Sequence, residues 1–267
     1  MKEPMLTPVE KHVLNSSPFS DIYSPTEKMR AIIVDNFPTL GKLAAMRFIE
    51  WVQSNPGGVV SLPTGKTPEH FIRWVTHLIK NWDNIEVQTE LKNWGLDAQI
   101  KPEISSLHFV QIDEFYPIDP DQGNSFYSYV KRFYIEGFGM NPDKALLMSY
   151  REMGFSTNQN LDSVWPTGEV DLSLRYRAAV TTKEADQQQV LMRVDQWCQE
   201  YEQRIRALGG IGFFLGGIGP DGHIAFNVRG SDHHSTTRLT AVNYETQATA
   251  AGDLGGIEVS DRKSTRL

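Results

Sequence analysis

Cysteine is nearly absent from this chain of 267 residues, in which Cys198 is the single example. One thiol excludes an intramolecular disulfide framework and a zinc site built from several cysteines, and it indicates a reducing, cytoplasmic setting. Long apolar runs are lacking as well: no window approaches about 18 uncharged apolar residues, and residues 1–15 lack the apolar stretch of a signal peptide. We therefore expect a soluble protein without a membrane span or a secretory leader.

Clusters of positive charge are also lacking. The chain has 26 Lys and Arg against 33 Asp and Glu, a formal net charge of -7, and its basic residues are scattered. Nucleic acids and anionic membranes attract basic patches, so we expect neither as a partner. An anionic small molecule would need a local positive site. Hydrophobic residues make up 40% of the chain, which is enough for the core of one α/β domain.

The order of apolar segments predicts strands that alternate with helices. Because helices connect parallel strands by crossovers, this order favours an open, mostly parallel, doubly wound (Rossmann-like) sheet with helices on both faces. The expected helices and strands fall, in order, at residues 27–34, 40–53, 59–62, 71–79, 107–112, 126–134, 185–208 and 213–215.

We expect one α/β domain over residues 25–267, preceded by an N-terminal arm at residues 1–24. In residues 151–183, the apolar residues follow no long stretch of helical or strand periodicity, and this segment is expected to form an irregular insertion. Residues 241–253 are expected to be helical, and residues 255–259 to begin a strand. The βα units that would close a doubly wound sheet are missing after these segments, so we expect either a fragment of a longer protein, truncated at its C-terminus, or an altered C-terminus.

Residues 213–227 carry the clearest indication of a site, because an apolar run ends there in glycines, a carboxylate and an imidazole. Ligands of open α/β sheets bind beyond the carboxyl ends of the strands, so we expect Asp221 and His223 to face a ligand crevice. The glycines also match a dinucleotide-binding fingerprint, but no helix is predicted to open at the third glycine, which argues against that function. From this stretch alone, a plain turn at Asp221 with His223 as a satisfied core histidine remains an alternative.

The strand at residues 59–62 leads through a glycine loop into a helix. Such a junction aims backbone N–H groups and the positive end of the helix dipole at one point, which suits a phosphate. The loop fails the Walker A spacing because Val60 stands where the first glycine would be, so we do not expect a nucleoside triphosphate. An ordinary turn with Lys66 as a solvated surface charge is the alternative.

Adjacent carboxylates, Asp113 and Glu114, follow the strand at residues 107–112. A strand buries its length and exposes its exit, which makes the pair a candidate for chemistry. The alternative is that Asp113 caps the turn and Glu114 is solvated. The aromatic residues at residues 126–134 are expected in the core rather than in a stacking platform, and Cys198 is expected to be a small buried hydrophobe rather than a nucleophile.

Taken in order, the three strand exits resemble the signatures of the glucosamine-6-phosphate deaminase and 6-phosphogluconolactonase superfamily. The resemblance spans about residues 40–259, and the joint order of the motifs makes coincidence improbable. The motifs are Leu62-Pro63-Thr64-Gly65-Lys66-Thr67-Pro68, Ile112-Asp113-Glu114-Phe115 and Gly217-Ile218-Gly219-Pro220-Asp221-Gly222-His223-Ile224-Ala225-Phe226-Asn227.

The resemblance implies a ring-opening, aldose-to-ketose deamination, in which glucosamine 6-phosphate and water give fructose 6-phosphate and ammonia. Asp113 would be the base that moves the C2 proton towards C1, and His223, oriented by Asp221, would assist ring opening. No metal and no organic cofactor is implied; the partner is a small-molecule sugar phosphate, and homo-oligomer formation is left open. The implied substrate- and phosphate-binding residues are Thr64, Gly65, Lys66, Thr67, Glu114, Gly219, Gly222 and Arg238.

The chain departs from the deaminase pattern at charged positions. Val228 stands where deaminases usually have a glutamate that assists the histidine, and Lys66 stands where the loop usually has a second glycine. The arginine that typically grips the phosphate falls at residues 251–252, which are alanine and glycine, and a phosphate-binding lysine would lie beyond Leu267. Lys66 and Arg238 are the residues that would replace the lost positive charge.

The departures from the deaminase pattern leave two classes of function as alternatives. The first is an enzyme acting on glucosamine 6-phosphate or a closely related amino-sugar phosphate, with a sugar-phosphate lactonase as a lesser alternative. The second is a non-catalytic sugar-phosphate-binding or regulatory module that retained the pocket and lost the ring-opening acid.

Overall fold

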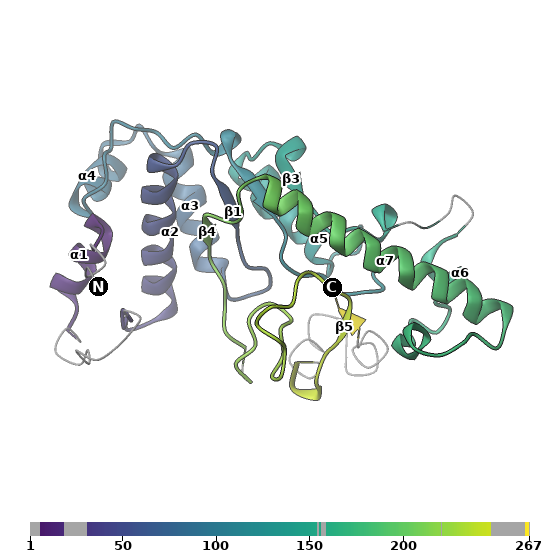
Figure 1. Cartoon of the computed structure of the whole chain (residues 1–267). Coiled ribbons are helices and arrows are strands. Elements are labelled where there is room, and N and C mark those ends of the chain that lie inside the picture. The colour runs from purple at the N-terminus through teal and green to yellow at the C-terminus, as the bar shows by residue number, and fades with distance from the viewer. Residues whose placement is uncertain are drawn as a thin grey trace.

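A short parallel sheet lies at the centre of the computed structural model of this chain (Figure 1). Its four strands follow the order β3-β2-β1-β4, and each neighbouring pair is parallel. The strands are β1 (Val59–Ser61), β2 (His108–Val110), β3 (Ala145–Leu146) and β4 (Phe213–Phe214). The structure describes residues 6–18, 31–153, 155, 159–219, 221–246 and 265–266.

Side chains alternate between the two faces of this sheet, and each face is covered by helices. Val60 and Phe109 belong to a core cluster that also holds the buried residues of α2 (Phe37–Ser54) and α3 (Glu69–Lys80). Val59 and Val110 belong to a second cluster with the buried face of α7 (Thr182–Ala207). Successive strand residues point to opposite faces, so both faces are buried, as a parallel sheet requires. The predicted doubly wound α/β fold is therefore confirmed.

On the first face, α2 begins at a side-chain cap. In α2, the Asn36 side chain accepts a hydrogen bond from the Thr39 N–H at 2.9 Å, and a proline stands in the first turn. The expected helix at residues 27–34 is wrong for residues 31–34, which are irregular because the cap at Asn36 begins a new helix just after them; residues 27–30 lie outside the described residues. α4 (Ile85–Asn93) completes this face.

The expected N-terminal arm contains a helix, α1 (Pro8–Ser16), that packs against α2. Val9 and Val13 of α1 are buried in the first core cluster, and the Val9 N–H donates to the Glu50 carboxylate at 3.1 Å. The division into an arm and a single domain stays a prediction.

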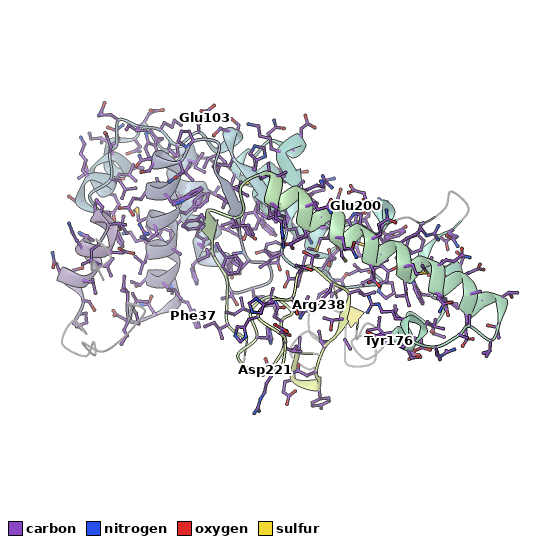
Figure 2. All side chains as sticks on the ribbon, in the orientation of Figure 1. Phe37, Glu103, Tyr176, Glu200, Asp221 and Arg238 are labelled. Carbon is purple, nitrogen blue, oxygen red and sulfur yellow. The ribbon has the colours of Figure 1, made fainter. Side chains whose placement is uncertain are left out.

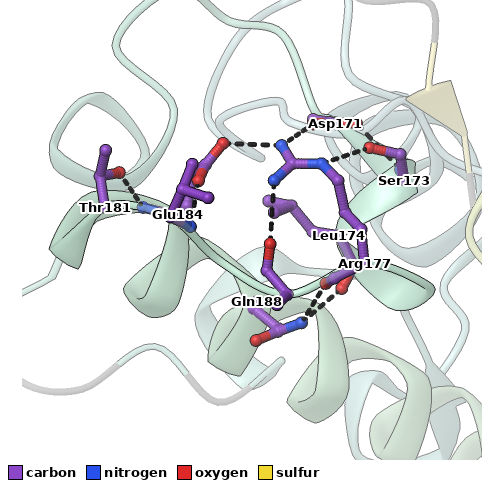
Figure 3. Close-up of polar contacts among 9 residues, drawn as sticks. Asp171, Ser173, Leu174, Arg177, Thr181, Glu184 and Gln188 are labelled. Atoms are coloured by element: carbon purple, nitrogen blue, oxygen red, sulfur yellow. Dashed lines mark hydrogen bonds and ion pairs between the residues drawn. The ribbon is translucent and has the colours of Figure 1, made fainter.

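The second face joins α7 to the expected irregular insertion, which contains the short elements η5 (Tyr150–Glu152), α6 (Leu161–Val164) and η6 (Leu172–Arg175). Figure 3 shows how η6 is tied to the first turns of α7. The Arg177 guanidinium donates to Asp171 and Glu184, both at 2.7 Å, and the Gln188 amide donates to the Leu174 carbonyl at 2.6 Å. Further along α7, Cys198 is 2% exposed, and burial raises the pKa of its thiol to about 12.

β5 (Thr240–Ala241) pairs in antiparallel fashion with β6 (Thr265–Arg266), away from the parallel sheet. Ala241 is thus in a strand rather than in the helix expected at residues 241–253, whereas residues 244–246, the last described before a gap, are helical. Residues 247–253, and the strand expected at residues 255–259, lie outside the described residues. No helix in the described part of the chain has both the length and the apolar character needed to cross a membrane.

Candidate active site

The exits of β1, β2 and β4 lie at one edge of the sheet because these neighbouring strands run parallel. Figure 2 shows Asp221 and Arg238 on this side of the molecule, opposite Glu103, which precedes β2. Phe115, just after β2, packs against Phe226, after β4, with their ring centroids 5.2 Å apart. The second and third motifs are therefore in contact, as expected for one site at the carboxyl ends of the strands.

Asp113 is a buried carboxyl group at the exit of β2, with 8% of its surface exposed. Burial, and then the negative charge of the neighbouring Glu114, raise the pKa of Asp113 to about 7. The Gln111 amide donates to the Asp113 backbone carbonyl at 2.9 Å and fixes the chain beside it. A carboxyl group that exchanges its proton near neutral pH is suited to general acid/base catalysis.

Glu114 is buried as well, but its contacts differ from those of Asp113. Its carboxylate accepts hydrogen bonds at the start of α5 (Phe126–Val130), and burial outweighs these bonds so that the pKa of Glu114 is raised. Glu114 thus fixes the position of α5, and its predicted contact with a ligand stays a prediction. The donors are the N–H groups of Phe115 at 2.8 Å, Phe126 at 3.1 Å and Tyr127 at 2.7 Å, and the Ser125 hydroxyl at 2.8 Å.

Asp221 and His223 form the predicted carboxylate–imidazole pair, with Asp221 Oδ1 2.5 Å from His223 Nδ1. The Asn243 amide donates to the other carboxylate oxygen of Asp221 at 2.6 Å. The hydrogen bonds from Asn243 and His223 both hold the pKa of Asp221 below its usual range, and the bond from Asn243 has the larger effect. The Thr246 hydroxyl lies 3.3 Å from His223 Nδ1. An anionic Asp221 orients the imidazole and leaves Nε2 as the nitrogen that can exchange a proton with a ligand.

Neither Asn243 nor Thr246 was predicted from the sequence. Thr246 donates its backbone N–H to the Asn243 side chain at 3.1 Å, so the two form a helix-cap type of contact. Asn is a preferred N-cap residue, but nothing in the sequence says that this cap would contact residues 221–223.

Gly219 and Gly222 allow the chain to turn back over itself at His223. The Gly219 N–H donates to the His223 carbonyl at 2.9 Å, and Gly222 has a φ of +86°, a conformation that favours glycine. A Cβ on Gly219 would lie only 2.1 Å from Cε1 of His223. These glycines therefore position the imidazole; that they also contact a ligand stays a prediction.

The predicted phosphate loop connects β1 to α3. Gly65 has a φ of +84°, Thr64 is half-buried, and Lys66 and Thr67 are exposed. The first turn of α3 has no side-chain cap, and its Glu69 N–H donates to the Lys66 carbonyl at 3.2 Å. Tyr134 holds the start of this loop, because its hydroxyl donates to the Pro63 carbonyl.

Arg238 lies with Asn227 on a cavity of about 290 Å³ beside the C-terminal half of α7. Its guanidinium donates to the Asn227 side chain at 3.1 Å and to the Thr236 carbonyl at 3.3 Å. Within the described residues, the lining of this cavity does not include Asp113, His223 or the phosphate loop. The structure thus does not bring Arg238 and Lys66 to one cavity, and their joint contact with a phosphate stays a prediction.

The fold and these residues define a class of protein: a doubly wound α/β protein with a carboxyl group and a carboxylate–imidazole pair at the strand exits. No grouping of three or more metal-binding side chains occurs among the residues that the structure describes.

Comparisons with known proteins identify relatives of this class, although no family model matches the chain. A glucosamine-6-phosphate deaminase of Caenorhabditis elegans is 52% identical over 59 residues, which are 22% of each chain. One of Borreliella afzelii is 49% identical over 55 residues, or 21% of this chain and 20% of the relative. One of Halothermothrix orenii is 25% identical over 218 residues, or 82% of this chain and 67% of the relative. The chain thus aligns with only about a fifth of the length of the first two relatives.

The fold has a solved counterpart, a monomeric glucosamine-6-phosphate deaminase described as a missing link of the NagB superfamily. The two structures have a TM-score of 0.61 over 90% of this chain and 75% of that chain, at 22% sequence identity. The relatives and the shared fold confirm the predicted resemblance to the glucosamine-6-phosphate deaminase superfamily.

Proposed function

We propose that the protein is a deaminating isomerase that converts glucosamine 6-phosphate and water into fructose 6-phosphate and ammonia. The observation that carries this proposal is the Asp113 carboxyl group, buried at a strand exit with a pKa of about 7. The relatives that are glucosamine-6-phosphate deaminases support it, and they favour it over a sugar-phosphate lactonase. Ammonia release from glucosamine 6-phosphate is the direct test.

In the proposed reaction, Asp113 removes the proton from C2 and returns a proton to C1 of the opened sugar. Water then adds at C2, and ammonia leaves. His223 transfers protons between the sugar oxygens during ring opening, and the negative charge of Asp221 stabilises the imidazolium that forms. Each proton transfer of this kind contributes about 10²- to 10⁴-fold to a rate when the group lies within hydrogen-bond reach.

The partner in this proposal is a small-molecule sugar phosphate, and the protein acts in the cytoplasm without a nucleic acid or a membrane. The exposed loop residues Lys66 and Thr67 and the uncapped start of α3 support phosphate recognition. We leave open whether the protein forms homo-oligomers.

Phosphate recognition gives the first expected result. We expect glucosamine 6-phosphate to bind at least about tenfold more tightly than glucosamine, because a charge-assisted hydrogen bond contributes about 1.5–3 kcal/mol. Calorimetry with both sugars under the same conditions measures the difference. Equal affinities would contradict a phosphate site at residues 64–67.

The second candidate function, a non-catalytic sugar-phosphate-binding module, is favoured by one residue. Val228 offers no acid where the deaminase pattern has a glutamate. Val228 is half-buried, and its N–H donates to the Phe226 carbonyl at 3.1 Å.

Val228→Glu is therefore expected to raise the turnover of cyclic glucosamine 6-phosphate by about tenfold or more, because it restores an acid for ring opening. Initial rates of ammonia release compare the variant with the wild type, and Val228→Gln is the control that adds a similar side chain without the charge. A folded Glu variant with no gain over the Gln variant would mean that another group supplies this acid.

A further inference from the structure

We propose that residues 125–136, here called the support segment, set the positions of all three strand-exit loops, and that Tyr134 is the positioning residue for the predicted phosphate loop. The segment consists of Ser125, α5 and the π-helical turn η3 (Lys131–Glu136). The part of this inference that concerns a phosphate ligand rests on the proposed function, whereas the positioning itself does not.

The first contact joins the support segment to the exit of β1. The Tyr134 hydroxyl donates a hydrogen bond to the Pro63 carbonyl, one residue before the predicted phosphate loop begins. The Tyr134 side chain is 0% exposed, and its ring packs against Phe109 and Phe138 with centroids 5.6 Å and 5.2 Å away. Burial also raises the pKa of Tyr134, so its hydroxyl remains a donor. The core thus fixes the donor that holds the loop.

The second contact joins the support segment to the exit of β2. The Ser125 hydroxyl and the N–H groups of Phe126 and Tyr127 all donate to the Glu114 carboxylate. Glu114 directly follows the proposed base, Asp113. Because a buried carboxylate with several donors is costly to displace, this contact ties the backbone at Asp113 to the start of α5.

The third contact joins the support segment to the loop after β4. The Phe126 ring is stacked on Phe226, with centroids 5.9 Å apart and an interplanar angle of 11°. Phe115 touches both rings, at 4.8 Å from Phe126 and 5.2 Å from Phe226. Phe226 follows His223 by three residues, so the aromatic cluster connects the imidazole loop to the same segment.

The π-helical turn explains how one short segment contacts the loops after β1, β2 and β4. A π-turn inserts one extra residue, which rotates the side chains beyond it by about 100° relative to a continuous α-helix. Tyr134 lies inside this turn, and Phe126 lies before it. The insertion therefore decides which face of the segment presents the Tyr134 hydroxyl. π-turns are rare and occur often at functional sites, which agrees with this role.

Tyr134→Phe tests the inference because it keeps the packed ring and removes only the donor. Tyr129→Phe is the matched control: Tyr129 lies on the same segment, with its ring 6.1 Å from that of Tyr134, and its hydroxyl makes no hydrogen bond with the described residues. In the ligand-free protein, we expect the backbone NMR order parameters of residues 64–67 to fall from about 0.85 towards about 0.6 in Tyr134→Phe and to stay unchanged in Tyr129→Phe.

Ligand affinity and turnover of the same two variants distinguish a role in positioning the loop from a role in catalysis. In Tyr134→Phe, we expect the Kd of glucosamine 6-phosphate to rise about three- to tenfold while the Kd of glucosamine stays constant and kcat stays within about twofold. Unchanged order parameters at residues 64–67, or a fall of the same size throughout the core, would overturn the positioning role. An equal effect of Tyr129→Phe would overturn it too.

A different result would contradict the proposed function. A wild-type protein that does not bind glucosamine 6-phosphate would contradict the proposed function and the phosphate part of this inference. The order-parameter measurement still decides whether Tyr134 positions the loop, because that measurement uses no ligand.

Discussion

Asp113→Asn is expected to lower the turnover of glucosamine 6-phosphate by about two orders of magnitude or more, with ligand binding nearly intact. Asparagine keeps the shape of the side chain and removes its basicity. Asp113 is buried at the exit of β2 with a pKa of about 7, whereas the amide of asparagine does not accept a proton near neutral pH and so cannot act as the base. Exchange of the C2 proton in deuterated water is the sharpest measurement, because it reports proton abstraction even where ammonia release is slow.

Wild-type exchange rates in the Asn variant would exclude Asp113 as the base. Absent exchange in the wild type, despite binding of the sugar phosphate, would favour the non-catalytic module. The turnover of the wild type should also rise with pH through about 7, as Asp113 loses its proton.

The stability of Asp113→Asn, measured against pH, is the control that distinguishes a loss of catalysis from a loss of folding. The folded-state pKa of Asp113, about 7, lies above the usual value for an aspartate, near 4. The unfolded chain therefore binds fewer protons between about pH 4 and 7, and the free energy of unfolding falls as the pH rises through that window. The Asn variant lacks this loss, so above pH 7 its melting temperature should equal or exceed that of the wild type.

Gly219→Ala is expected to lower turnover by about 10²-fold, because its Cβ would lie 2.1 Å from Cε1 of the His223 ring. The imidazole must move, and the 2.5 Å contact between Asp221 and His223 breaks with it. The initial rate of ammonia release measures the loss, and the NMR signals of the His223 ring report the displacement.

The chain offers a matched control for this substitution. A Cβ added at Gly217 would meet no atom of the described residues within 4 Å, so Gly217→Ala adds the same methyl group two residues earlier without a clash there. This variant is expected to keep near wild-type turnover. Equal losses in both variants would show that the loop tolerates no alanine, and that the His223 contact is not the cause.

Strands β1, β2 and β4 were predictable because their sequence signals are local. Each of these three strands ends in a loop with glycine or acidic residues, and parallel strands bring such exits to one edge whatever lies between them. The two-residue strand β3 and the order of the strands in the sheet were not predicted. The same reasoning placed Asp221 and His223 at a strand exit, whereas their mutual contact was implied by the resemblance to the superfamily.

The features that the sequence did not predict depend on contacts between residues that are distant in the chain, or on which carbonyl accepts each backbone hydrogen bond. Asn243 reaches Asp221 across 22 residues, and no spacing rule relates the two positions. For Glu114, the sequence shows a carboxylate at a strand exit but not that the side chain turns towards the start of α5. The apolar spacing of residues 126–134 predicts a helix, but a π-turn differs from an α-turn only in which carbonyl accepts each bond, which composition does not reveal.

The burial of Cys198 makes the protein convenient for site-specific labelling. A thiol that is 2% exposed, with its pKa raised to about 12 by burial, carries almost no thiolate at neutral pH and reacts slowly with maleimides. Since the chain has no other cysteine, a cysteine introduced at the exposed Thr67 would be the one reactive thiol. A fluorophore there would report ligand arrival at the loop without the native cysteine having to be removed.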